Sequence, residues 1–294
     1  MLARLSMALL WLLHWLPLPL LGRLGEALGV LLYGLAGERR RVGRINLARF
    51  MPELPEPQRE QLLRRHFRAF ARGLLESGIA WWASPARLRA LTVIEGEQHW
   101  QAVAHRRCIF LVPHFVGIDI QGLRLCLDHP LLAIYTRQKN RAFDALLLER
   151  RSRFPGMHLV SRQQGVRGLL KALKPANDQP VPTLQLSPDM DLGPRDSLFA
   201  PFFNVPVATV SVLPRLARML DAVVVPLVVT QLPDYRGYAL RFHPAWLDYP
   251  SEDVQADVIR MNAFVEQCAR AQPECYHWLH KRLKTRPPGE QSPY

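Results

Sequence analysis

The sequence predicts an α/β protein in which an open, largely parallel sheet is flanked by helices and preceded by a hydrophobic N-terminal anchor helix. Three observations predict it: an apolar run at the N-terminus, a long basic amphipathic pattern, and short apolar runs that alternate with helical patterns from about residue 86. We expect a membrane anchor at 1–38, a basic helical segment at 39–85, an α/β domain at 86–286 and a flexible tail at 287–294.

The N-terminal apolar run is interrupted. Its first piece, Ser6–Leu21, is shorter than the roughly 20 residues that a spanning helix needs, and it contains Pro17 and Pro19. No small-x-small cleavage site follows it, which disfavours a signal peptide. We therefore expect an uncleaved anchor that either spans the membrane or lies deep in its interface, with Trp11, Trp15 and Tyr33 at the interface.

The 294-residue chain carries a formal net charge of +13, which indicates an anionic partner. Nucleic acid is disfavoured, because the sequence lacks zinc-finger spacing, an aromatic RNA-binding signature and a basic heptad region. Arginines of the basic helical segment fall mostly off its apolar stripe, so they either form a solvated face or bind anionic lipid head groups. They include Arg64, Arg65, Arg68 and Arg72.

The four cysteines, Cys108, Cys126, Cys268 and Cys275, form no Cys-x2-Cys pair. This spacing indicates neither a zinc site nor a disulfide framework. We expect reduced thiols and a main domain on the cytoplasmic side of the membrane.

Strand and helix patterns alternate through the α/β domain. The expected strands are 91–95, 108–112, 131–135, 159–160, 183–186, 222–229 and 238–242. The expected helices are 96–104, one reaching 127, 140–154, 165–173, one from about 208 to 220, and 254–271. Residues 187–204 are expected to form a loop, and 205–207 to lead directly into the next helix.

His114 follows the most strand-like of the early runs, Cys108–Val112, after Pro113. Ligands of open parallel sheets bind beyond the carboxyl ends of the strands, which is where His114 falls. If His114 lies at the turn and Asp119 reaches back from the first helical turns, the carboxylate orients an imidazole that can take a proton from a hydroxyl. The alternative is a buried loop histidine beside a carboxylate that favours the helix dipole.

Two further loops follow predicted strands. Arg137, Lys139 and Asn140 follow one strand and either project into the same crevice, where the Arg137 guanidinium can bind a phosphate or stabilise an oxyanion, or form a solvated loop. Asp189 and Asp191 follow another strand, in a spacing found in metal-binding or sugar-binding loops. Two carboxylates are few for a divalent cation, so we expect no metal.

Six stretches, taken in order, resemble the late acyltransferases of lipid A biosynthesis, the lauroyl and myristoyl transferase family of Gram-negative bacteria. The resemblance covers nearly the whole chain. The stretches are Arg44–Glu53, His114–Asp119, Tyr135–Arg137, Pro188–Pro194, Phe199–Phe203 and Trp278–Pro287.

The resemblance implies a fold like that of the glycerol-phosphate acyltransferases and an inner-membrane enzyme with its catalytic domain on the cytoplasmic side. Such an enzyme moves a fatty acyl chain from acyl carrier protein to a hydroxyl of a lipid A precursor, with no cofactor. The resemblance makes His114 the general base and Asp119 its orienter, although lipid A enzymes commonly have Glu at the latter position. It places Arg137, Asp189 and Asp191 along the crevice that holds the acceptor and the donor.

Besides a thioesterase, in which water replaces the acceptor hydroxyl, two other functions stay open. One is acylation of another membrane lipid, such as lysophosphatidate or a glycolipid, because the related glycerol-phosphate enzymes have Asp at the position of Asp119. The other is a non-catalytic membrane protein that binds anionic lipids. In that case replacing His114 leaves function intact.

Overall fold

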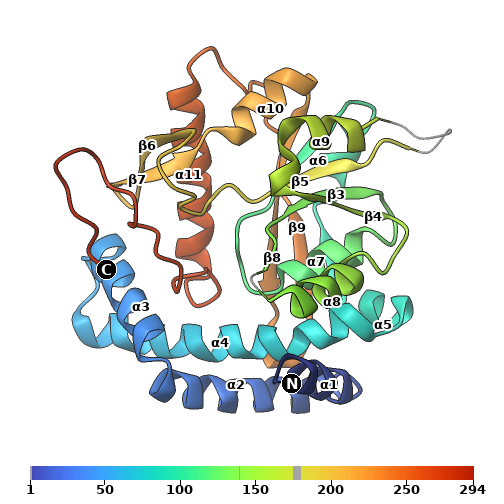
Figure 1. The fold of residues 1–294 in the computed structure, drawn as a ribbon, viewed down its shortest axis with the longest axis vertical. Coiled ribbons are helices and arrows are strands. Elements are labelled where there is room, and N and C mark those ends of the chain that lie inside the picture. The colour runs from blue at the N-terminus through green and yellow to red at the C-terminus, as the bar shows by residue number, and fades with distance from the viewer. Residues whose placement is uncertain (1, 139, 175–179) are drawn as a thin grey trace.

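A computed structural model describes residues 2–138, 140–174 and 180–294, and a seven-stranded sheet forms its centre (Figure 1). The strand order is β1-β9-β8-β2-β5-β3-β4. All neighbouring strands are parallel except β8 and β9, which are antiparallel, so the prediction of a largely parallel sheet is confirmed. The strands are β1 Thr92–Glu95, β2 Cys108–Leu111, β3 Leu131–Tyr135, β4 Met157–Ser161, β5 Thr183–Leu186, β8 Val223–Gln231 and β9 Tyr238–Phe242.

Strand β2 lies in the middle of this order and is buried along its whole length. Phe110 packs into a hydrophobic cluster with residues of α4 and α7, whereas Ile109 and Leu111 pack into a second cluster with residues of α10 and α11. Successive side chains of a strand point to opposite faces, and both faces here are covered. This explains why β2 is an uninterrupted apolar run.

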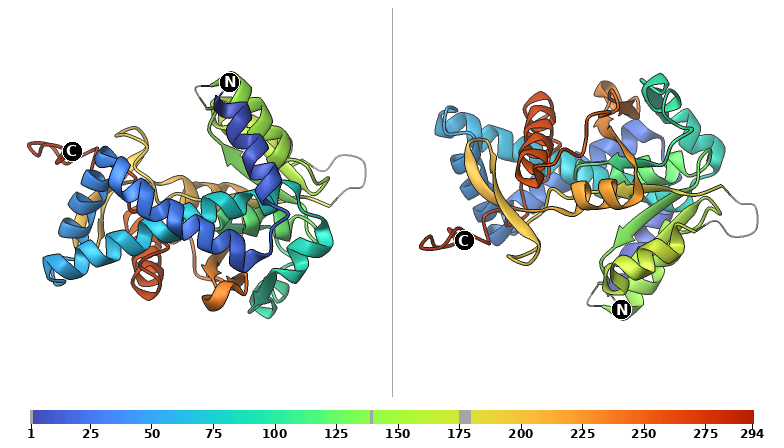
Figure 2. Two further views of the ribbon diagram at one scale, coloured as in Figure 1. Left: turned by 90° about the horizontal axis from the view of Figure 1, so that it is seen from below. Right: turned by 90° about the horizontal axis from the view of Figure 1, so that it is seen from above.

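The helices cover both faces of the sheet and its lower end (Figures 1 and 2). The longest, α4, crosses beneath the sheet, and α2 runs beside it. The helices of four or more residues are α1 Leu2–Leu13, α2 Leu18–Leu35, α3 Gly37–Phe50, α4 Glu56–Trp82, α5 Pro85–Ala90, α6 Gln98–Gln101, α7 Ile118–Leu125, α8 Arg141–Arg151, α9 Gly165–Ala172, α10 Val212–Leu220 and α11 Val254–Ala271.

A second, two-stranded sheet was not expected. Residues 187–204 were predicted to be a loop, but β6 Ser197–Phe202 pairs there with β7 Val205–Val210 in an antiparallel hairpin. The two turn residues, Phe203 and Asn204, have φ values of 50° and 60°. Two-residue hairpin turns of this kind need positive φ at both positions and usually carry glycine, so the Phe-Asn pair gave no turn signal.

The anchor segment forms two helices that pack on α4. Glycines of α2 allow this close approach: a Cβ added at Gly25 would lie 2.4 Å from Cα of Arg72, and one at Gly29 would lie 2.5 Å from Cα of Arg68. Of the described helices, α2 alone is long and apolar enough to cross a membrane. One face of α2 is therefore fixed along a helix of the main fold.

Candidate active site

Two strands of the central sheet bring the main polar groups of the site together. His114 lies three residues beyond the end of β2, and Asp189 lies three residues beyond the end of β5. The two strands are parallel neighbours, with Leu111 opposite Leu186, so both loops emerge at the same edge of the sheet. This is the edge at which open α/β sheets bind their ligands.

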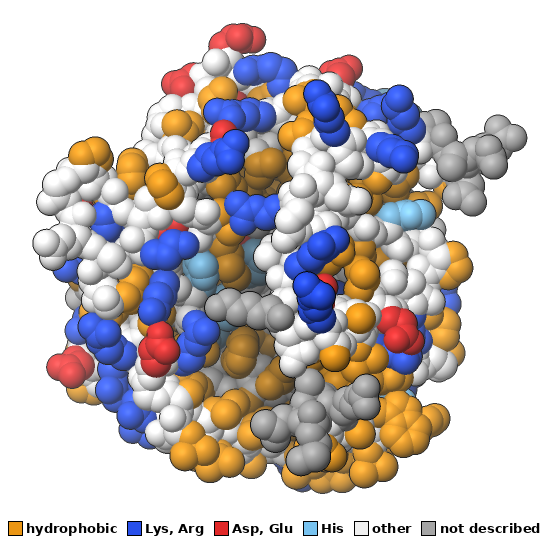
Figure 3. All heavy atoms as spheres, viewed as in Figure 1, with side chains coloured by type: hydrophobic (Ala, Val, Ile, Leu, Met, Phe, Trp, Pro, Cys, Tyr) orange, Lys and Arg blue, Asp and Glu red, His pale blue; other side chains and the backbone are white. Residues whose placement is uncertain are grey.

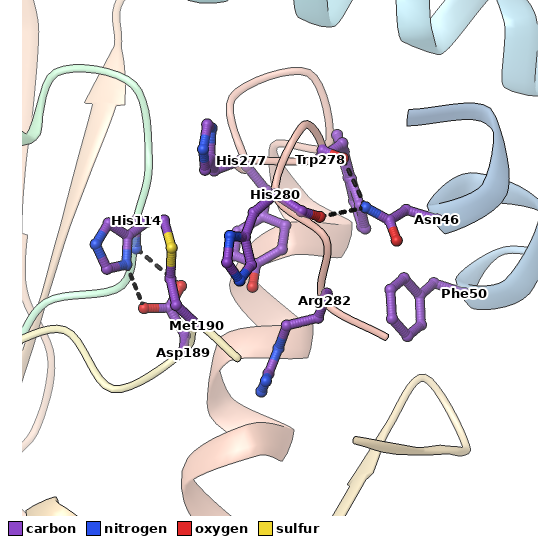
Figure 4. Close-up of a pocket in the computed structure, with 10 residues that line it drawn as sticks. Asn46, Phe50, His114, Asp189, Met190, His277, Trp278, His280 and Arg282 are labelled. Carbon is purple, nitrogen blue, oxygen red and sulfur yellow. Dashed lines mark hydrogen bonds and ion pairs between the residues drawn. The ribbon is translucent and has the colours of Figure 1, made fainter. Parts of the chain in front are cut away.

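His114 and Asp189 form a two-point contact (Figure 4). Nδ1 of His114 lies 2.7 Å from Oδ1 of Asp189, and the backbone N–H of His114 donates to Oδ2 at 2.9 Å. Burial of the Asp189 carboxyl opposes ionisation, but the adjacent His114 and its hydrogen bonds outweigh this effect and lower the pKa of Asp189 to about 2. An ionised carboxylate can only accept, so Nδ1 of His114 carries the proton and Nε2 is left with its lone pair.

Asp119 lies elsewhere. It occupies the first turn of α7, and its carboxylate forms an ion pair with Arg151 of α8 at 2.9 Å. The chain turns sharply before it, at Gly117 with φ 100°, so α7 starts in a new direction after His114. The carboxylate that contacts His114 in this structure is thus Asp189, and the expected contact from Asp119 is absent.

Asp191, the second carboxylate of that loop, is buried and holds the C-terminal segment. Its carboxylate accepts hydrogen bonds from the backbone N–H of Gly193 at 2.9 Å and of Thr285 at 2.6 Å, and from the Thr285 hydroxyl at 2.9 Å. These contacts occupy both oxygens. Asp191 therefore fixes the chain beside the site, and its carboxylate is not among the groups that line the cavity described below.

The other predicted binding residues lie beyond β3. Arg137 is exposed there, and no ion pair joins it to another residue of the part of the chain that the structure describes. Lys139 lies outside the described residues. The structure thus does not bring Arg137 into contact with the His114–Asp189 pair.

A small cavity, partly open to solvent, adjoins His114. Figure 3 shows histidine side chains at the bottom of a hollow on this face, with lysine and arginine side chains around it. The cavity is lined by Asn46, Phe50, His114, Asp189, Met190, Tyr276, His277, Trp278, His280 and Arg282.

Residues 276–282 of the C-terminal segment form one wall of the cavity (Figure 4). The backbone N–H of His277 donates to the carbonyl of His114 at 3.2 Å, which ties this wall to the loop that carries His114. From α3, Nδ2 of Asn46 donates to the carbonyls of Trp278 and His280, both at 2.7 Å. The hydroxyl of Tyr294 donates in turn to Asn46, so the tail that we expected to be flexible contacts this wall.

Sequence reasoning missed the partnership of His114 with Asp189 and the contributions of Asn46, Tyr276 and His280. One signal was present: both His114 and Asp189 directly follow predicted strands, and the carboxyl ends of parallel strands share an edge. Among the described residues, no group of three His, Cys, Asp or Glu side chains could hold a metal ion.

The arrangement suits proton transfer from a hydroxyl. An imidazole held in one tautomer by an ionised carboxylate has its cationic form stabilised when it takes a proton. The side chain of His114 is 29% exposed and that of Asp189 only 2%, so the imidazole is accessible while its carboxylate partner is shielded. The four cysteines are buried and free, and burial raises the pKa of each thiol.

Comparison with known proteins gives a consistent result. The family model of the bacterial lipid A biosynthesis acyltransferases matches residues 1–285. The chain is 34% identical over 293 residues to the lipid A biosynthesis lauroyltransferase of Escherichia coli K12, covering 99% of this chain and 94% of that protein. It is 31% identical to the palmitoleoyltransferase of the same organism over 98% of this chain and 93% of that protein, and 32% identical to the myristoyltransferase over 94% and 83%.

Proposed function

Because the chain belongs to the bacterial lipid A biosynthesis acyltransferase family, we propose that it moves a fatty acyl chain from acyl carrier protein to a hydroxyl of a lipid A precursor. The observation that carries the chemical part of the proposal is the His114–Asp189 pair at the edge of a solvent-accessible cavity. It supplies a base of fixed orientation without any nucleophilic side chain, and the acceptor brings its own hydroxyl.

In the first step, Nε2 of His114 takes the proton of the acceptor hydroxyl while the hydroxyl oxygen attacks the thioester carbonyl carbon. A new C–O bond forms and the carbonyl oxygen becomes an oxyanion. The imidazolium that results lies 2.7 Å from the ionised Asp189, which stabilises it. Asp189 is thereby proposed as the orienting carboxylate, the role expected from the sequence for Asp119.

In the second step, the tetrahedral intermediate collapses and the C–S bond breaks. The Nε2 proton of His114 passes to the departing sulfur, which leaves as the carrier thiol. The ester product and the neutral imidazole remain, so the protein ends in the state in which it began. The steps need no redox group, since one ester replaces one thioester.

The surface charge supports two anionic partners, an acidic carrier protein and a phosphorylated lipid. Exposed arginines crowd α3 and α4, which flank the cavity wall on the side of Asn46. Long-range attraction of this kind steers charged partners and weakens as salt concentration rises. These arginines are Arg39, Arg41, Arg44, Arg49, Arg64, Arg65 and Arg68.

The proposal is tested with purified protein, acyl carrier protein that bears a radiolabelled acyl chain, and either a lipid A precursor or lysophosphatidate as acceptor. We expect label to move to the lipid A precursor and not to lysophosphatidate, and His114→Ala to remove the activity. Transfer to lysophosphatidate alone would replace the acceptor that we propose. Transfer that survives in His114→Ala would remove His114 from the mechanism.

Lipid A acyltransferases are membrane-associated, and α1 and α2 offer the surface for this contact. Figure 3 shows hydrophobic side chains along the lower edge of the molecule, where Figure 1 draws α1 and α2. These side chains form an exposed apolar face, in which Trp15 is 68% exposed and Leu35 73%. The exposed apolar face comprises Leu5, Leu9, Trp11, Leu12, Trp15, Leu20, Leu24, Val30, Leu31 and Leu35.

We propose that α1 and α2 lie in the plane of the inner membrane, within its cytoplasmic leaflet. If α2 crossed the bilayer, α4 would be drawn in with it, because their backbones touch at Gly25 and Gly29. The exposed Arg64, Arg65 and Arg68 of α4 would then enter the hydrocarbon at high cost. An interfacial position buries the apolar face and leaves these arginines at the lipid head groups.

A reporter fused to the N-terminus distinguishes the two arrangements. For helices in the membrane plane, N-terminal and C-terminal fusions both report the cytoplasm. A periplasmic N-terminus with a cytoplasmic C-terminus would show that α2 spans the membrane.

A further inference from the structure

His280 is the group of the cavity wall that the mechanism above leaves unused. Its ring lines the same cavity as His114 and projects from the C-terminal segment (Figure 4). Burial is the main cause that lowers the pKa of His280, to about 4, and the nearby Arg282 adds to it. The ring is therefore neutral at pH 7 and carries a single N–H.

One hydrogen bond decides which nitrogen of His280 carries that proton. The backbone N–H of Asp191 points at Nε2 of His280 at 3.0 Å. A backbone N–H can only donate, so Nε2 accepts with its lone pair and the proton sits on Nδ1. Within the described part of the chain, no acceptor is hydrogen-bonded to this Nδ1–H, although Nδ1 is not sealed away from solvent.

Arg282 and Asn46, two other donors of the wall, are engaged by the protein itself. The two terminal nitrogens of Arg282 donate to the Ala208 carbonyl at 2.6 Å and to the Thr209 hydroxyl at 2.9 Å, and its Nε is buried without a hydrogen-bond partner among the described residues. Nδ2 of Asn46 donates to two backbone carbonyls. His277 stacks on Phe70 with ring centroids 5.7 Å apart, and no backbone donor fixes its tautomer.

We propose that Nδ1–H of His280 donates a hydrogen bond to the thioester carbonyl oxygen as it becomes an oxyanion, which makes His280 a second catalytic residue. The inference rests on the proposed acyl transfer and deepens it. Attack by the hydroxyl at His114 places negative charge on an oxygen within the same small cavity. A neutral N–H of fixed orientation stabilises that charge and does not compete with His114 for the proton.

Two substitutions separate this role from a structural one, because asparagine and glutamine each reproduce one half of the imidazole. In His280→Gln, the side-chain oxygen can reach the Nε2 position and accept from Asp191, but no donor stands at the Nδ1 position. In His280→Asn, the amide nitrogen stands near the Nδ1 position as a donor, but the contact to Asp191 is lost.

Both variants are assayed in full-length, detergent-solubilised protein with acyl carrier protein and a lipid A precursor, after thermal unfolding has shown that each is folded. Removal of one oxyanion donor costs about 10²–10³-fold in kcat, so we expect a loss of about 10²-fold in His280→Gln with KM little changed. We expect His280→Asn to keep more activity than His280→Gln. A His280→Gln enzyme with the wild-type kcat, or an order in which asparagine is worse, would overturn the inference.

A measurement on the wild-type protein does not depend on the variants. Nitrogen-15 chemical shifts of the His280 ring at pH 7 should show a protonated Nδ1 and an unprotonated Nε2. The opposite tautomer, or a charged ring, would contradict the role of His280 but leave the His114 mechanism standing. If wild-type protein transferred no acyl chain in the assay, the proposed function itself would fail, and the inference about His280 with it.

Discussion

Nδ1 of His114 lies 2.7 Å from Oδ1 of Asp189, and the same carboxylate accepts the backbone N–H of His114 at 2.9 Å. The two contacts fix both the ring and the loop that carries it. In this structure Asp189, which follows the neighbouring strand β5, therefore orients the imidazole of His114. Asp119, five residues after His114 in the chain, is paired with Arg151 instead.

Substitution of these two carboxylates by their amides tests that assignment. Asp189→Asn cannot hold the Nδ1–H tautomer by charge, and loss of an orienting carboxylate in comparable His–Asp pairs costs about 10⁴-fold in kcat. We expect a loss of about 10³–10⁴-fold in kcat for Asp189→Asn, measured under saturating donor and acceptor. The matched control, Asp119→Asn, breaks only the ion pair with Arg151 and should retain most of kcat. Equal losses in both variants, or a larger loss in Asp119→Asn, would contradict the assignment.

The difference between Asp119 and Asp189 marks what the sequence could predict. The position of His114 followed from a local pattern, an apolar strand that ends at Pro113. The adjacency of β2 and β5 did not, because β3 and β4 lie between them in the chain and strand order is set by packing between distant segments. Sequence spacing therefore favoured Asp119, the carboxylate that lies nearer to His114 along the chain.

The hairpin of β6 and β7 was missed for a local reason. Its turn uses Phe203 and Asn204 with positive φ, where glycine is the usual signal. By contrast, α11 was predicted with its observed limits, Val254–Ala271, from a long periodic pattern, and Asp253 caps it in the structure. Elements defined by their own periodicity were predictable, and those that depend on a strained turn were not.

Protonation of His66 should make the free energy of unfolding depend on pH. This side chain is fully buried in α4, where its Nδ1 donates to the Glu274 carbonyl at 2.9 Å and its Nε2 has no partner. Burial lowers its pKa to about 4 from 6.5. Between pH 6.5 and 4 the unfolded chain binds a proton at this histidine that the folded chain does not bind. The free energy of unfolding is therefore unaffected by His66 above pH 6.5 and falls by about 3 kcal/mol as the pH is lowered to 4.

The control for His66 is His66→Asn, which keeps an amide donor near the Nδ1 position and has no proton to gain. Chemical denaturation at several pH values should give a shallower slope for the variant between pH 6.5 and 4. An unchanged slope would show that other groups dominate acid unfolding.

Asn46 should hold the cavity wall in place. Asn46→Ala leaves the carbonyls of Trp278 and His280 without their donor, and an unpaired buried polar group costs about 1–3 kcal/mol. We expect a lower melting temperature and reduced acyl transfer. Tyr294→Phe, which removes only the hydroxyl that donates to Asn46, should have a smaller effect on both measurements.

Two glycines of α2 provide a matched pair for its contact with α4. A Cβ at Gly25 would lie 2.4 Å from Cα of Arg72, whereas a Cβ at Gly34 would have no heavy atom within 4 Å. Gly25→Ala should destabilise the protein by about 1–3 kcal/mol through overpacking. Gly34→Ala should be neutral or gain up to about 1 kcal/mol from helix propensity. If both variants unfold at the same temperature, α2 does not pack on α4 in the membrane.

The most direct test of the central claim is mass spectrometry of lipid A from a strain that lacks the gene and is complemented with wild type, His114→Ala or Asp189→Asn. The account predicts that deletion removes one secondary acyl chain, that wild type restores it, and that neither variant does so although both proteins are present in the membrane. Lipid A that is unchanged by deletion in a strain with no second such enzyme, or full restoration by His114→Ala, would contradict it.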